Sequence, residues 1–180
     1  MEVIQIILYI IIIITIILLF YTHIYNKIKT QILKINSVES EIDESLRTKY
    51  DLLIKIISEI KQVDKDEKKF ADVEKIKDED LSSFEFERKL TDIESQIYTI
   101  RNDNTKLIKN NTFNDLWYEI NSLNSKIKAE EKYYNENTTI YNSLVTKFPS
   151  KIVAIILKLK EKRYFDGKNM YDKNIKDFKI

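Results

Sequence analysis

The chain begins with an unbroken apolar stretch and continues with long segments in which apolar residues recur every three or four positions. The opening stretch, "VIQIILYIIIIITIILLFYT", covers residues 3–22 and has no ionisable side chain except two tyrosines. About 20 helical residues at 1.5 Å each are long enough to span the roughly 30 Å hydrocarbon core of a bilayer. The pattern predicts an N-terminal transmembrane helix that continues beyond the membrane, because neither Gly nor Pro interrupts it.

A cleaved signal peptide is the alternative interpretation of this stretch. Its apolar region is too long for one, and no small-x-small cleavage site follows it, so we expect a retained single-pass anchor that contacts membrane lipid through residues 3–22. Lys27, Lys29 and Lys34 follow the span, and no acidic residue occurs before Glu39. The positive-inside rule therefore predicts an N-terminus outside the cell and a cytoplasmic C-terminal domain.

Beyond the membrane the periodicity predicts three long helices and a short one. The first keeps an apolar stripe to about Lys77, and Ser82 with Glu85 forms a capping box that starts the second. Thr112 is expected to cap a third helix with a coiled-coil heptad seam, and Ser150 a short fourth helix. The predicted fold is all-α: an N-terminal transmembrane helix continuing into an antiparallel helical bundle. We expect an anchor at 1–24, a bundle domain at 25–165 and a polar tail at 166–180.

The fourth segment, "KIVAIILKLKEKRYF", is basic and amphipathic, which is compatible with a position on an anionic leaflet. Helices that alternate in direction argue against that position. If the first helix leaves the membrane, the second returns and the third leaves again, the fourth starts at the far end of the bundle. The apolar face of the fourth helix is then expected to cap the bundle.

Composition narrows the chemistry that the chain can perform. The 180 residues include one Gly, one Pro and no Cys, and the formal net charge is +1. These numbers exclude disulfides, thiolate metal sites and a cysteine nucleophile, and they argue against phosphate-binding glycine loops and bulk attraction to nucleic acid. The single histidine, His23, cannot supply the two Glu-x-x-His motifs of a four-helix di-metal site. We therefore predict no enzyme activity, no cofactor and no metal, and interpret the acidic runs at 64–67 and 77–80 as exposed charged turns.

The stretch "YNENTTIYNSLVTKFP", residues 134–149, places an aromatic residue at every seventh position. The heptad spacing puts Tyr134, Tyr141 and Phe148 on one packing seam, with Asn135 and Asn142 at its edge. The structural interpretation is that the rings are buried and the asparagines bond to backbone across helices. On this interpretation Phe148→Ala costs about 3–5 kcal/mol, as truncation of a buried aromatic does. The alternative is a ligand-binding stripe.

These residues resemble the LemA family, a bacterial group with an N-terminal membrane helix and a helical-bundle domain. "IDESLRTKYDLL" at 42–53 is similar to the family pattern I-D-x-x-L-x-R-R-x-D-L-I, and residues 134–149 resemble Y-N-x5-Y-N-x5-F-P with the same spacing. Thr48 and Lys49 depart from the paired arginines, Ile54 from a proline, and Asn124 and Glu131 from a family Glu and Arg. The motif residues, to which the resemblance assigns a structural role, are Ile42, Asp43, Leu46, Asp51, Leu52, Lys61, Glu67, Tyr134, Asn135, Tyr141, Asn142, Phe148 and Pro149.

The resemblance implies an anchored bundle at the bacterial cell membrane and no particular reaction. Three functions stay open: a scaffold that recruits a protein partner, a ligand- or metal-binding sensor or enzyme, and a self-assembling homo-oligomeric coiled coil. A binding cavity needs convergent polar groups in a concave pocket. Glu130, Asn137 and Asn104 lie on helix seams and are candidates for such groups or for register-setting polar positions.

Overall fold

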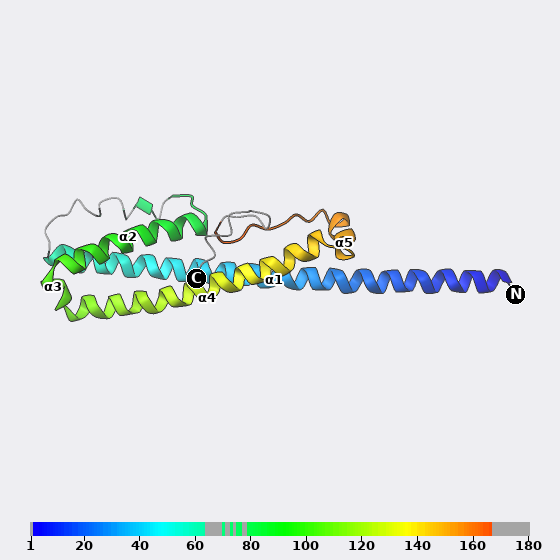
Figure 1. The fold of residues 1–180 in the computed structure, drawn as a ribbon, viewed down its shortest axis with the longest axis horizontal. Helices are drawn as coiled ribbons and strands as arrows, with labels where there is room; N and C mark the ends of the chain where they lie inside the picture. Colours follow the sequence, from blue (N-terminus) through cyan, green and yellow to red (C-terminus); the bar gives the residue numbers. More distant parts are fainter. Residues whose placement is uncertain (1, 64–69, 71–72, 74, 77–78, 167–180) are drawn as a thin grey trace. The chain divides into compact units, whose positions relative to one another are not determined.

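The computed structural model describes residues 2–63, 70, 73, 75–76 and 79–166. Within these residues the regular structure is helical and no strand occurs, as predicted (Figure 1). The helices are α1 (Glu2–Val63), α2 (Ser83–Asp103), α3 (Thr105–Ile108), α4 (Asn111–Thr146) and α5 (Ser150–Ile156). The chain divides into two compact units. One comprises Met1–Ser37 with Tyr134–Ile180, and the other comprises Val38–Tyr133, so that α1 and α4 each contribute to both.

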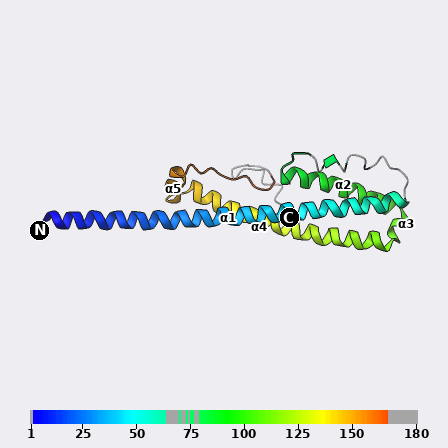
Figure 2. The same ribbon diagram turned by 180° about the vertical axis from the view of Figure 1, so that it is seen from behind.

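In the first unit the N-terminal part of α1 is apolar, and no other described segment packs on it. Its 18-residue window of highest hydropathy is entirely unburied, and α1 is long and apolar enough to cross a membrane. A packed core begins directly after this stretch. It contains Ile24, Ile28 and Ile35 of α1, Tyr141 and Val145 of α4, and Val153 and Ala154 of α5. Thus α5 lies beside α1 close to where the apolar stretch ends (Figure 2).

In the second unit the predicted apolar stripes form the core. The stripe of α1 is buried as the 3.6-residue period indicates. Its buried residues are Ile42, Leu46, Leu53, Ile56, Ile57 and Ile60. The buried residues of the other helices are Leu90, Ile93 and Ile97 of α2, Leu107 of α3, and Phe113, Ile120 and Ile127 of α4. In the first half of the predicted α4 seam, Phe113, Ile120 and Ile127 are buried, and Leu116 and Leu123 are half-buried.

Contacts along α1 give the directions of its neighbours. Ser83, at the start of α2, donates a hydrogen bond to Asp43 (2.5 Å), and Glu94 further along α2 pairs with Lys49 (2.8 Å). The two helices therefore run in the same direction. In contrast, Ser45 bonds to Glu130 while Glu59, further along α1, bonds to Asn110, so α4 runs opposite to α1.

The prediction that the helices alternate in direction is therefore wrong for the second helix. The predicted end of the first helix near Lys77 is also wrong, because α1 ends at Val63. The 19 residues from 64 to 82 separate α1 from α2. A chain of that length can return along the roughly 30 Å of α1 that α2 then follows. The fourth helix consequently starts beside the residues that follow the apolar stretch, not at the far end of a bundle.

Helix ends test the predicted caps. The capping box is confirmed, since the Ser82 hydroxyl accepts from the Glu85 N–H and the Glu85 carboxylate accepts from the Ser82 N–H. The start of α4 is capped by Asn110, whose side-chain oxygen accepts from the Phe113 N–H (3.0 Å), and not by Thr112. The short helix α5 exists, but Ser150 donates to the Lys147 carbonyl instead of capping it.

Candidate functional site

The Tyr/Asn motif of the first unit holds an extended segment of the same chain. We call residues 160–165, which follow α5, the C-terminal strap. Tyr141 donates its hydroxyl hydrogen to the Lys160 carbonyl (2.9 Å). Asn142 makes two bonds to Lys162: its amide donates to the Lys162 carbonyl (2.8 Å), and its side-chain oxygen accepts from the Lys162 N–H (2.9 Å). All three bonds go to backbone atoms of the strap. Tyr141 and Asn142 therefore hold the strap independently of the side chains that the strap carries.

The other Tyr-Asn pair of the motif lies seven residues earlier on α4 and also bonds to the strap. Tyr134 donates to the carbonyl of Arg163 (3.3 Å), and the Asn135 side-chain oxygen accepts from the Phe165 N–H (2.8 Å). The Tyr134 ring also meets the Phe165 ring edge-on, with centroids 6.2 Å apart. We call Tyr134, Asn135, Tyr141 and Asn142 the Tyr/Asn clamp.

The seven-residue interval has a simple physical reason. Seven residues of helix advance by roughly 10 Å, and three residues of extended chain advance by about the same distance. Accordingly, a step of seven on α4 matches a step of three on the strap: Tyr141 and Tyr134 bond to carbonyls three residues apart, and Asn142 and Asn135 bond to residues three apart. The repeat thus keeps a helix in register with an extended segment that runs opposite to it.

Burial separates the three aromatic positions of the motif. Tyr141 is buried, and burial raises the pKa of its phenol; Tyr134 is half-buried. The prediction that Phe148 lies on the same buried seam is wrong, because its side chain is 81% exposed. The helix ends at Thr146, before the third repeat, so Phe148 no longer lies on the seam. Asn142, expected at the edge of the seam, is completely buried.

The other motif residues have mainly packing and capping positions. Ile42, Leu46 and Leu52 are buried in the second unit, and Asp43 accepts the hydrogen bond from Ser83. Asp51 and Lys61 are exposed. Pro149 directly precedes α5, and Glu67 lies outside the described residues.

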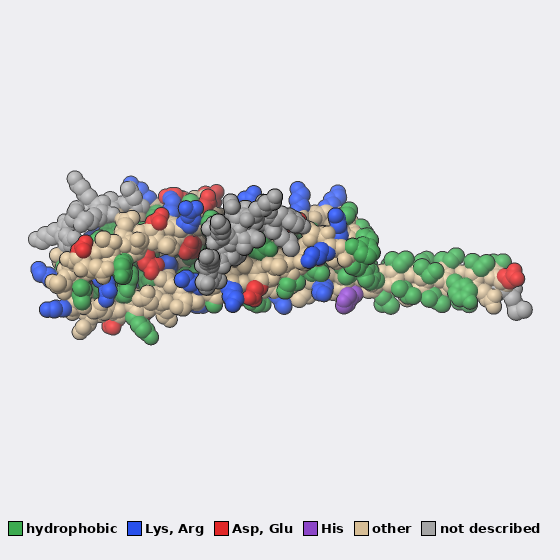
Figure 3. All heavy atoms as spheres, viewed as in Figure 1, with side chains coloured by type: hydrophobic (Ala, Val, Ile, Leu, Met, Phe, Trp, Pro, Cys, Tyr) green, Lys and Arg blue, Asp and Glu red, His purple; other side chains and the backbone are tan. Residues whose placement is uncertain are grey.

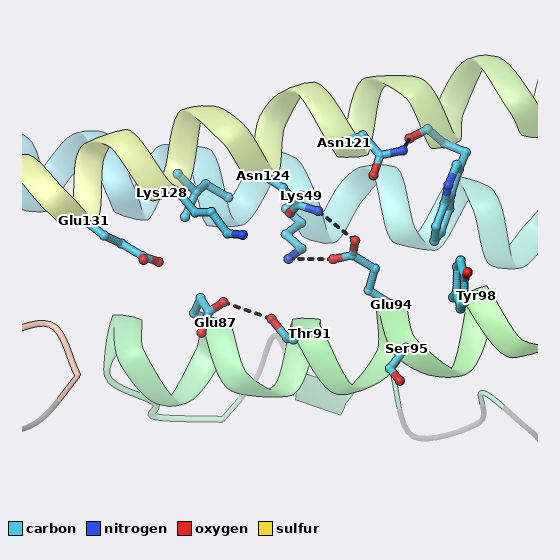
Figure 4. A pocket seen from close by; sticks show the side chains of 12 residues that line it. Lys49, Glu87, Thr91, Glu94, Ser95, Tyr98, Asn121, Asn124, Lys128 and Glu131 are labelled. Carbon is cyan, nitrogen blue, oxygen red and sulfur yellow. Dashed lines mark hydrogen bonds and ion pairs between the residues drawn. The ribbon is translucent and has the colours of Figure 1, made fainter. Parts of the chain in front are cut away.

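The second unit contains a polar cleft that sequence reasoning missed. It has a volume of about 480 Å³ and is lined by residues of α1, α2 and α4 (Figure 4). Lys49 of α1, which is buried, pairs with Glu94 of α2 (2.8 Å). Asn124 of α4 donates a hydrogen bond to the other oxygen of Glu94 (2.7 Å). This network joins all three helices at the wall of the cleft.

Two further carboxylates and one further lysine line the same cleft. Glu87 accepts a hydrogen bond from Thr91 (2.9 Å), and Glu131 and Lys128 extend from α4 toward α2 (Figure 4). Burial, followed by the negative charge of Glu87, raises the pKa of Glu131 to about 7. Counting Glu87, Glu94 and Glu131 against Lys49 and Lys128, the lining has an excess of one negative charge when all are ionised.

Aromatic rings form the other end of the cleft. Trp117 stacks on Phe113 (centroids 6.1 Å apart, planes at 9°) and on Tyr98 (6.3 Å, 28°). The Arg101 guanidinium lies over the Trp117 ring at 5.9 Å. A wall of stacked rings next to carboxylates is suited to a cation with an apolar stem, which gains contact with both.

The seam residues proposed to line a cavity lie elsewhere. Glu130 is buried and accepts from Ser45 (3.2 Å), Asn137 is buried in the first unit, and Asn104 caps α3. A signal for the cleft was nevertheless present, because Lys49, Asn124 and Glu131 are positions where the chain departs from the LemA pattern. The structure brings these three departures together.

Metal binding finds no support in the described part of the chain. No group of three or more His, Asp or Glu side chains that is able to hold a metal ion occurs among the residues that the structure describes. His23 is exposed, directly after the apolar stretch. The acidic run at 64–67 and part of the run at 77–80 lie outside the described residues, whereas Glu79 and Asp80 are exposed as expected.

Comparison with known proteins identifies one family. The family model described as "LemA family" matches residues 38–177, which covers both the polar cleft and the Tyr/Asn clamp. A search of curated proteins finds no match to the chain.

Proposed function

The chain belongs to the LemA family, and on that premise we propose that it is a membrane-anchored helical scaffold that recruits a protein partner at the cytoplasmic face of a bacterial membrane. The observation that carries this proposal is the change of environment within one helix. In α1, the apolar side chains of residues 3–20 are exposed and no other described residue covers them, whereas Ile24, Ile28 and Ile35 are buried in a packed core. A helix that is apolar on all sides and unburied is suited to lipid.

The polar cleft supports recognition of a partner. Binding hot spots are rich in Trp, Tyr and Arg. Trp117 and Tyr98 line the cleft beside carboxylates, and Arg101 lies over the Trp117 ring. The chemistry fits a Lys or Arg side chain of a partner, whose charge would meet Glu87 and Glu131 and whose stem would lie on the rings. With Glu87, Glu94 and Glu131 all ionised, the lining has one excess negative charge, which an incoming cation neutralises.

A photo-crosslinking experiment in native membranes tests this proposal. A photoreactive phenylalanine analogue at Asn121, which lines the cleft, should capture a discrete protein partner. The same analogue at Glu119, an exposed residue of α4 outside the cleft lining, is the matched control and should not. Loss of the Asn121 adduct on changing both Glu87 and Glu131 to Gln would support the charge argument. Equal adducts at Asn121 and Glu119, or none at either, would contradict recognition through the cleft.

A second candidate function is a sensor for a small organic cation, and the raised pKa of Glu131 favours it. A bound ammonium group stabilises the ionised form of Glu131, so binding near neutral pH should release a proton. An alkyl diamine is a suitable probe in calorimetric titration of the full-length protein. Tighter binding at pH 8 than at pH 6, lost in Glu131→Gln, supports the sensor. Binding that does not depend on pH, or no binding, argues against it.

A further inference from the structure

The helix α5 exposes an apolar face that nothing in the described chain covers. Four large apolar side chains in and just before α5 are exposed: Phe148 (81%), Ile152 (54%), Ile155 (65%) and Ile156 (61%). The three isoleucines follow the three- and four-residue spacing of one helix face, opposite the buried Val153 and Ala154. Soluble surfaces rarely group so many large apolar side chains on two helical turns.

The position of α5 tells what covers this face. Val153 and Ala154 pack in the same core cluster as Ile24 and Ile28 of α1. These two α1 residues lie about 3 Å and 9 Å along the helix beyond Thr22, where the apolar stretch ends. The headgroup layer of a bilayer is about 5–8 Å thick on each side. If α1 crosses the membrane, α5 therefore lies at the depth of the headgroups.

The charges around α5 fit the same place. The segment from Asn137 to Lys160 contains four lysines (147, 151, 158 and 160) and no acidic residue. The neighbouring part of α1, from residue 3 to residue 38, contains three lysines and no acidic residue. Hydrophobic side chains gather at the part of the first unit where the apolar helix meets the packed core, with basic side chains beside them (Figure 3). An apolar face bordered by lysines is the pattern of a helix at an anionic membrane surface.

An apolar groove adjoins α5 on the same side of α1. It has a volume of about 300 Å³ and is lined by Tyr25, Ile28, Lys29, Ile32, Leu33, Leu157 and Leu159. The residues come from the first turns of α1 beyond the apolar stretch and from the chain directly after α5. Its composition suits an acyl chain whose headgroup is held near Lys29.

We propose that α5 is a second membrane contact, which lies in the interface of the anionic leaflet with Ile152, Ile155 and Ile156 inserted among the lipids. The inference rests on the proposed anchoring by α1 and adds to it a surface and a lipid class. It also reverses the expectation that the fourth helix caps the far end of a bundle, because α2 follows α1 in the same direction and α4 returns.

Depth measurement in vesicles tests the proposal directly. The chain has no cysteine, so single substitutions Ile155→Cys, Ile12→Cys and Ser40→Cys allow one bimane label each on the full-length protein. Vesicles of phosphatidylcholine and phosphatidylglycerol with a share of spin-labelled acyl chains provide the quencher. All three positions are exposed, and a thermal melt of each variant checks that the fold is unchanged.

We expect the labels at Ile155 and Ile12 both to be quenched by the lipid spin labels and the label at Ser40 not to be. The additional change of Lys147 and Lys151 to Glu should reduce quenching at Ile155 and leave Ile12 unaffected. Quenching at Ile12 without quenching at Ile155 overturns the contact of α5 but keeps the anchor. An apolar emission shift at Ile155 without lipid quenching shows that a protein covers the face, and also overturns the proposal. Absence of quenching at Ile12 contradicts the anchor itself.

Discussion

Replacement of Asn142 by Ala tests how the Tyr/Asn clamp holds the C-terminal strap. Asn142 is completely buried and makes both of its side-chain bonds to the backbone of Lys162, at 2.8 and 2.9 Å. Each such bond contributes about 0.5–1.5 kcal/mol net, so Asn142→Ala should cost roughly 1–3 kcal/mol. Because the bonds hold the strap and not the helices, we expect the cost to appear as local release of residues 160–165 and only weakly in global unfolding.

Amide hydrogen exchange of the full-length protein in detergent measures this local release. The Lys162 N–H should exchange about 5- to 150-fold faster in Asn142→Ala, which corresponds to the loss of roughly 1–3 kcal/mol of local protection. Asn135→Ala is the matched control, because the Asn135 side chain accepts a bond from the Phe165 N–H of the strap and not from Lys162. It should increase exchange less, and mainly at Phe165.

A second substitution at Asn142 distinguishes the bond that its side chain donates from the bond that it accepts. Asn142→Asp keeps an acceptor for the Lys162 N–H but places a second acceptor oxygen against the Lys162 carbonyl in a completely buried site, so it should release the strap at least as much as Asn142→Ala. If Asn142→Ala leaves the exchange of residues 160–165 unchanged, the clamp does not hold the strap and the register argument is refuted.

Three further predictions concern single residues. Phe148→Ala should change the free energy of unfolding by less than about 0.5 kcal/mol, because the ring is 81% exposed. A thermal melt in detergent checks this. Glu131 has a folded-state pKa of about 7 against an ordinary 4.5, so the folded state keeps a proton that the unfolded state loses, and stability falls as pH rises from 4.5 to 7. Glu131→Gln should therefore melt like wild type below pH 4.5 and be more stable above pH 7, by about 1 kcal/mol once solvent screening is allowed for; an equal effect at both pH values would contradict this. Lys158 has a φ of 54°, so Lys158→Gly should stabilise the end of α5 by about 1 kcal/mol, and a lower melting temperature would contradict the strain argument.

The helical elements and most of the core could be predicted because their signal is local. Ile42, Leu46 and Leu53 occur at helical spacing, and each is buried. Ser82 and Glu85 form their capping box within four residues. Such features depend on the periodicity and chemistry of one segment, which the sequence states directly.

The relative directions of the helices could not be predicted in this way. Nothing in the stripe of α2 tells whether it runs with α1 or against it, since a rotated helix presents the same apolar face. The absence of Gly and Pro after Val63 favoured a helix to Lys77, but α1 ends at Val63. This end changes which way α2 runs and, with it, the position of α5.

The prediction that the motif asparagines bond to backbone is confirmed, but the strap as their partner and the polar cleft were missed, for different reasons. The strap is held through backbone atoms of Lys160, Lys162 and Phe165, and backbone recognition leaves no pattern in the side chains that are recognised. The cleft joins Lys49, Glu94 and Asn124 from three helices, and no single segment shows that combination. The predicted burial of Phe148 was wrong because the heptad pattern in the sequence extends past Thr146, where α4 ends.

Protease protection in sealed right-side-out vesicles tests the proposed membrane anchor and its orientation most directly. With residues 3–22 across the membrane and the lysines of α1 inside, protease added outside should leave everything after Thr22 intact, and the protein should stay in the membrane after alkaline extraction. Disruption of the vesicles by detergent should then allow digestion of the exposed turns. Release of the protein by alkali would contradict the anchor, and digestion beyond Thr22 in sealed vesicles would contradict the cytoplasmic position of the two units.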